Sequence, residues 1–181
     1  MQRPSRRRTP SDLPGLDIAE QKSWQNFLHA ALRFHTTMDR WLTEAHQLSV
    51  IDLRVLDILD KTEDGAARMG DLADALGANP HHMTKRIRRL EERGFVRREQ
   101  NSDDRRGVVA RISDDGRRVA GHASLNYAQG VKTHLIGTLS RRQLATLEEN
   151  CRRINSGLKQ ADSTLYVSRA AHGESAAKLP L

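Results

Sequence analysis

Apolar residues recur at helical spacing over most of this chain. Between residues 16 and 45 they return every three or four positions, which predicts one long amphipathic helix. A second helix is expected from Ser49, whose hydroxyl can cap its first turn. This helix would bury Leu53, Leu56 and Leu59. The chain is therefore expected to begin with one long helix and one short one.

Two further short helices follow, joined by a tight turn. The stretch MGDLADALGAN predicts a helix that stops at Gly77, since glycine readily takes the left-handed conformation at a helix end. Asn79 can cap the next helix, and Pro80 can occupy its first position, where no backbone N–H is needed. That helix should end before Gly94. This arrangement is typical of a helix-turn-helix.

The hydrophobic period changes after this motif. FVRREQ and VVARIS predict two short strands, and the polar loop NSDDRRG between them predicts a hairpin with arginines at its tip. Two more helices are expected, one from Ser113 to about Leu139 and one from Ser140 to beyond Ile154. The expected fold class is mainly α with a small β-hairpin.

The second helix of the motif has an unusual charge pattern. Met83, Ile87 and Leu90 form one narrow apolar stripe, while the remaining surface is basic and carries no acid from His81 to Arg89. A solvated helix would usually interleave acids to form ion pairs one turn apart. We therefore expect an external polyanion to neutralise this face. A DNA major groove accepts a helix and offers phosphates on both walls.

The composition agrees with a polyanionic partner and limits the other classes of function. The formal net charge is +7, and no window approaches the length of a membrane span. We expect a cytoplasmic protein that has no membrane association and no cofactor. No enzymatic activity is expected either, because no catalytic motif is present. The single cysteine, Cys151, cannot form an intrachain disulfide. It can be read as a structural thiol or as a redox sensor.

The order of these motifs resembles the MarR (multiple-antibiotic-resistance regulator) family of winged helix-turn-helix regulators. The family's wing pattern is Asp-x-Arg, followed by a strand that ends in Leu-Thr-x-x-Gly. Here it corresponds to Asp104–Arg106 and Ile112–Gly116, with Ile and Ser in place of Leu and Thr. The segments LSVIDLRVLDIL and MGDLADALG match the family's preceding helices. The resemblance extends over about residues 18–158.

The resemblance implies a winged helix-turn-helix DNA-binding lobe together with a helical dimerisation region. The lobe would comprise residues 49–116, and the dimerisation region residues 16–48 and 117–160. Composition alone predicts a disordered basic arm over residues 1–15 and a flexible tail over residues 161–181. The expected assembly is a homodimer that places two recognition helices on a pseudo-palindromic operator of double-stranded DNA.

The function implied is a transcriptional repressor that a small phenolic or antibiotic-like ligand releases from DNA. On the recognition helix, base edges would be contacted by His81, His82, Thr84 and Lys85, and phosphates by Arg86 and Arg89. In the wing, Arg106 would enter the minor groove, Asp104 would orient it, and Arg105 would lie nearby. The ligand pocket would be lined by His35, Met38, Trp41 and Leu53.

Two alternatives stay open. A sequence-tolerant architectural DNA-binding protein would also suit the basic arm and the positive charge. Some members of the family sense zinc, and His46 with Glu44, or His122, would be the candidates here, although no metal site is predicted.

Overall fold

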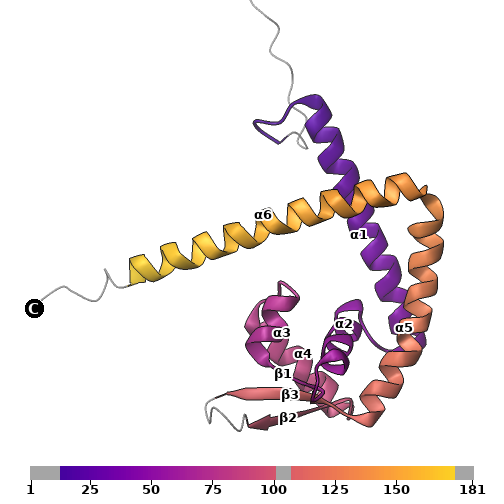
Figure 1. Ribbon diagram of the computed structural model, residues 1–181, viewed down its shortest axis with the longest axis vertical. Helices are drawn as coiled ribbons and strands as arrows, with labels where there is room; N and C mark the ends of the chain where they lie inside the picture. Colours follow the sequence, from indigo (N-terminus) through magenta and orange to yellow (C-terminus); the bar gives the residue numbers. More distant parts are fainter. Residues whose placement is uncertain (1–12, 101–106, 174–181) are drawn as a thin grey trace, which may run out of the picture. The chain divides into compact units, whose positions relative to one another are not determined.

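The computed structural model describes residues 13–100 and 107–173, with side chains as far as residue 160. The fold is mostly helical with a small antiparallel sheet, which confirms the predicted fold class (Figure 1). The chain divides into two compact units, Met1–Gly130 and Val131–Leu181. The elements in chain order are α1 (Ile18–His46), α2 (Val50–Lys61), β1 (Ala66–Arg68), α3 (Met69–Ala75), α4 (Pro80–Glu92), β2 (Val96–Gln100), β3 (Val108–Ile112), α5 (Asp114–His134), the 3-10 turn η1 (Ile136–Thr138) and α6 (Arg141–Gly173).

The first two helices begin with reciprocal caps. At α1 the Asp17 carboxylate accepts from the Glu20 backbone N–H, and the Glu20 carboxylate accepts from the Asp17 N–H. At α2 the predicted cap Ser49 makes the same exchange with Asp52. Each arrangement satisfies backbone donors that the first turn of a helix leaves without partners.

The core of the first unit forms where α2, α3 and α4 meet the sheet. Leu56, Leu59 and Leu72 are fully buried there, as are Ile87 and Leu90 from the apolar stripe of α4. Burying one such side chain stabilises the fold by roughly 1.5–3 kcal/mol. The predicted inner face of the helix-turn-helix is thereby confirmed.

The sheet has three strands rather than the two that were predicted. Its order is β1-β3-β2, and both pairs are antiparallel. β2 and β3 form the expected hairpin, with Val96 opposite Ile112. β1 was not predicted, because a three-residue strand is too short to show an alternating pattern. Its Ala66 lies opposite Arg111 of β3.

The C-terminal helices differ from the prediction in two places. α5 ends at His134 instead of continuing to Leu139, and a 3-10 turn follows in which the Thr138 hydroxyl donates to the Leu135 carbonyl at 2.8 Å. Ser140 then caps α6 with Gln143, as its position suggested.

The last helix also extends past residue 160, where a flexible tail was expected to begin, and continues to Gly173. The intervening residues contain neither glycine nor proline, so the local sequence permits helix to propagate although it lacks an apolar stripe.

Candidate nucleic-acid interface

Helix α4 presents a basic, exposed face opposite its buried stripe. The Asn79 side-chain oxygen accepts from the His81 backbone N–H at 2.9 Å, and Pro80 occupies the first turn, so the helix starts as predicted. The outer side chains line a shallow depression, and its residues are His82, Lys85, Arg86, Arg88 and Arg89. The surface is concave and positively charged, which suits a polyanion.

Most of the predicted contact residues do lie on this face. The side chains of His81, His82, Lys85 and Arg89 are exposed. In the part of the chain that the structure describes, no carboxylate lies within ion-pair distance of Lys85 or Arg89. Thr84 is exposed as well, but its hydroxyl donates to the Pro80 carbonyl at 3.0 Å, so this oxygen is left mainly as an acceptor.

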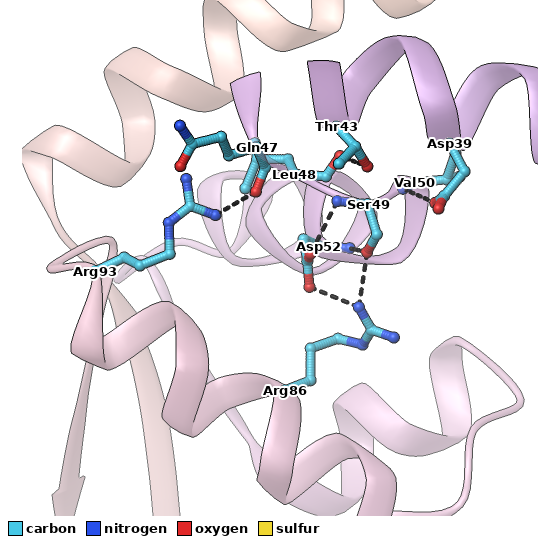
Figure 2. A network of polar contacts seen from close by, with 9 residues as sticks. All are labelled: Asp39, Thr43, Gln47, Leu48, Ser49, Val50, Asp52, Arg86 and Arg93. Carbon is cyan, nitrogen blue, oxygen red and sulfur yellow. Dashed lines mark hydrogen bonds and ion pairs between the residues drawn. The ribbon is translucent and has the colours of Figure 1, made fainter. Parts of the chain in front are cut away.

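Arg86 departs from the prediction, because its guanidinium turns toward the body of the domain. Its Nη1 donates to Asp52 Oδ1 at 2.6 Å and to Ser49 Oγ at 2.7 Å (Figure 2). The Arg86 side chain is 22% exposed and that of Asp52 is 15% exposed. The Arg86 guanidinium is thus bonded to the start of α2, and its contact with phosphate stays a prediction. Its spacing could have indicated this, since Arg86 lies three residues after Met83 and four before Leu90, at the edge of the buried stripe.

Arg93, just after α4, makes a second connection of this kind that the sequence analysis missed. Its guanidinium donates to the carbonyl of Gln47 and, at 3.2 Å, to that of His46. The same group lies 4.6 Å above the Phe95 ring, a favourable cation–π geometry. Arg93 was not among the predicted contact residues, and no spacing rule links it to a loop forty-six residues earlier.

The hairpin carries charges that are already paired within the fold. The Arg98 backbone N–H and Nε donate to Glu91 at 3.1 and 2.6 Å. Burial raises the pKa of Glu91, but these bonds and the charges of Arg98 and Arg88 outweigh it, so the pKa lies below its usual value. Arg111 bonds Glu99 at 2.9 Å, which raises the pKa of the guanidinium. The predicted wing contacts Asp104, Arg105 and Arg106 lie outside the described residues.

Only two of the four predicted ligand-pocket residues, Trp41 and Met38, line a cavity in this region. Trp41 lines a cavity between α1 and α5, with Glu44, Ala45, Asn126 and Gln129 as the other lining residues. Met38 joins Trp41 at a narrower neighbouring cavity. Leu53 is buried in the core and His35 is exposed, and neither lines these two cavities. Asn126 and Gln129 of α5 were not among the predicted lining residues, because their spacing alone does not place them beside Trp41.

The described residues provide little for the alternative chemistries. Across residues 13–100 and 107–160, no three histidine, cysteine or acidic side chains gather in a way that could hold a metal ion. His46 Nε2 instead lies 2.9 Å from Asn126 Nδ2. Cys151 is a half-buried free thiol. Among the described helices, none is both long and apolar enough to cross a membrane.

Comparison with known proteins identifies the same motif. Residues 48–108 match the MarR family. A 72-residue segment is 31% identical to an uncharacterized HTH-type transcriptional regulator, YfiV, of Bacillus subtilis. That match covers 40% of this chain and 44% of YfiV, so it spans less than half of the relative's length.

Two solved structures from Streptomyces coelicolor share most of the fold. AbsC, a MarR family transcriptional regulator, is 25% identical with a TM-score of 0.76, over 82% of this chain and 99% of AbsC. Sco3205, a MarR family regulator in complex with DNA, is 26% identical with a TM-score of 0.77, over 79% of this chain and 93% of Sco3205. A mutant MarR from E. coli complexed with operator DNA, at 18% identity and a TM-score of 0.66, shares the fold over 77% of this chain and 99% of that one.

Proposed function

Given that the chain carries a MarR-family domain and has the fold of MarR-family transcriptional regulators, we propose that it is a dimeric regulator that binds specific DNA sites. The observation that carries this proposal is the outer face of α4. Its first turns carry exposed histidine, lysine and arginine side chains, and the first acid of the helix is Glu91. A helix with this charge distribution gains the most binding free energy in a major groove, where its basic side chains can neutralise phosphates and contact base edges.

The roles of the side chains follow from their positions on α4. His81, His82 and Lys85 lie in the first two turns, the part of a recognition helix that usually reaches base edges. Arg89 lies one turn further along and would hold a phosphate. Of the wing residues, Arg106 would enter the minor groove with Asp104 orienting it. Sco3205, which has a similar fold, was solved in complex with DNA, and this supports DNA binding by the present chain.

Dimerisation would cover apolar side chains that the single chain leaves exposed. On α1, Trp24, Phe27 and Leu32 are 43, 46 and 58% exposed. On α6, Ile154 and Leu158 are 47 and 59% exposed. Large exposed apolar side chains at helical spacing are typical of a protein interface. A two-fold dimer would set two copies of α4 about one DNA turn apart, and its two-fold symmetry would be matched by a pseudo-palindromic site.

The cavity at Trp41 supports regulation by a small molecule. An apolar ring could lie against the indole, while Asn126 and Gln129 supply hydrogen-bond partners. Such a ligand would release the protein from DNA only to the extent that it binds the DNA-incompetent arrangement more tightly. Repression relieved by a phenolic or antibiotic-like compound is the regulation we propose.

Selection of binding sites from random duplex DNA tests the proposal. A specific regulator should enrich a two-fold symmetric sequence and keep it in the presence of excess genomic DNA. An architectural protein would enrich no sequence and would be removed by the competitor. Equal retention on all duplexes would therefore refute sequence-specific regulation and favour the alternative.

A further inference from the structure

We propose that Arg86 and Arg93 are positioning residues that fix the orientation of α4 on the corner between α1 and α2. This inference rests on the proposed function, since it concerns how the recognition helix is held against DNA. The corner consists of His46, Gln47, Ser49 and Asp52. All the contacts involved lie within the first unit of the chain.

The two arginines extend from the same side of the recognition helix and bind the corner through hydrogen bonds. Arg86 reaches Ser49 and Asp52 at the start of α2, while Arg93 reaches the Gln47 carbonyl just after α1 (Figure 2). Arg93 also donates to the carbonyl of His46, the last residue of α1. Seven residues separate the two arginines, which is about two helical turns and roughly 10 Å along the axis. Two attachments at this separation resist both rotation of α4 about its axis and tilting of the helix.

The corner to which they attach is itself held firmly. Gln47 takes the left-handed conformation, with φ 54°, and it is the only non-glycine residue with positive φ among those described. Leu48 is fully buried. The Asp39 carboxylate accepts from the Val50 backbone N–H at 2.8 Å, which joins the corner to α1. A left-handed residue other than glycine persists only where its surroundings hold it in place.

The geometry opposes a direct contact between Arg86 and phosphate. To reach DNA, the guanidinium would leave both Ser49 and Asp52, and the half-buried Asp52 carboxylate would lose its charged partner. Removing the partner of a buried or half-buried charge is costly. Arg89 and Lys85, which have no such carboxylate among the described residues, are the better phosphate ligands on this helix. Arg86 is thus expected to act on DNA through the orientation of α4.

The substitution Asp52→Asn separates the two roles by the sign of its effect. If Arg86 contacted phosphate, neutralising Asp52 would free the guanidinium for that contact and strengthen binding to all DNA beyond any change seen in Asp57→Asn. If Arg86 positions α4, the same change loosens the helix and weakens binding to the selected site. The asparagine oxygen can still accept from the Ser49 N–H, so the cap of α2 is retained.

The experiment measures the affinity of the full-length protein for its selected operator duplex and for a scrambled duplex across a salt series. Asp52→Asn and Arg86→Met should each lower operator affinity by on the order of tenfold, comparable to losing one base contact. Affinity for the scrambled duplex and its salt slope should stay unchanged. Asp57→Asn is the matched control, because Asp57 is on the same helix and pairs only with Arg54 and Lys61 in the described ion pairs.

Two results would overturn the inference. One is tighter binding of Asp52→Asn to both duplexes. The other is a salt slope for Arg86→Met that is shallower by about 0.9 per protomer, as loss of a phosphate contact requires. If Arg86→Met does not fold, Asp52→Asn decides the matter by itself. Failure of the wild-type protein to distinguish the two duplexes would instead refute the proposed function, so the two failures can be told apart.

Discussion

Replacing either of two glycines on α5 with alanine should change stability in opposite directions. Gly116 is buried at the start of the helix, and an added Cβ would lie 2.2 Å from the Phe95 carbonyl oxygen and 2.9 Å from Ile112 Cγ1. Gly121 is exposed five residues later, and an added Cβ there would meet nothing within 4 Å. The same substitution on the same helix thus isolates the effect of backbone contact.

The magnitude follows from the surroundings of Gly116. Real Cβ contacts essentially never fall below 3.0 Å, so the Phe95 carbonyl must move by close to ~1 Å. That carbonyl accepts from the Ser113 N–H at 3.0 Å, and the movement would weaken this bond. Overpacking costs about 1–3 kcal/mol and the lost bond about 1 kcal/mol, while alanine recovers about 1 kcal/mol of helix propensity. Gly116→Ala should therefore destabilise the protein by about 2 kcal/mol.

Thermal unfolding followed by circular dichroism measures both variants. Gly116→Ala should lower Tm by about 4–8 °C, given that 1 kcal/mol corresponds to about 2–4 °C in a chain of this size. Gly121→Ala should raise Tm by about 2–4 °C, because only the helix propensity changes. Equal increases in Tm for the two variants would refute the close approach of the Phe95 backbone to α5 at Gly116.

Three further results are expected. Asn79→Ala should lower the free energy of unfolding by roughly 1 kcal/mol, and Ser49→Ala by about twice as much. The Ser49 hydroxyl caps a helix and also accepts from Arg86, so its removal loses two interactions. Equal losses for the two variants in urea unfolding would refute this. The lowered pKa of Glu91 means that its carboxylate stabilises the fold above the unfolded pKa and loses that effect as pH falls through the folded pKa. Glu91→Gln should therefore lower the free energy of unfolding at neutral pH but not in acid below the folded pKa of Glu91. A pH-independent difference in urea unfolding would contradict this. Trp24→Ala should shift sedimentation toward the monomer, because the indole is 43% exposed in the single chain, and an unchanged profile would place the dimer contact elsewhere.

Much of the fold could be predicted because its signals are local. Ser49 and Asn79 cap the helices that the sequence assigned to them, and the buried stripe of α4 follows directly from its spacing. The hairpin strands were visible as a change of period. β1 was not, because its three residues gain their strand conformation from pairing with β3, which is about forty residues further along the chain.

The candidate site was predicted less completely, because charge pattern alone does not say where a long side chain points. Lys85 and Arg89 have no described carboxylate within ion-pair distance and stay on the outer face, as expected. Arg86 has the same charge but finds Asp52 and Ser49 across the domain, and this tertiary contact decides its direction. The residues that line the cavity at Trp41 differ from the predicted ones for a similar reason. Leu53 is buried in the core, whereas Asn126 of α5 lines the cavity.

The central claim is that the outer face of α4 reads DNA, and removing one charge from it is the most direct test. Lys85→Ala can be compared with Lys22→Ala, which removes the same charge from an exposed position near the start of α1. Fluorescence anisotropy on the selected operator should show a loss of about tenfold or more for Lys85→Ala, with relaxed discrimination against single-base variants, and a change within about twofold for Lys22→Ala. Equal affinities of the two variants for the operator, with discrimination intact, would contradict the account.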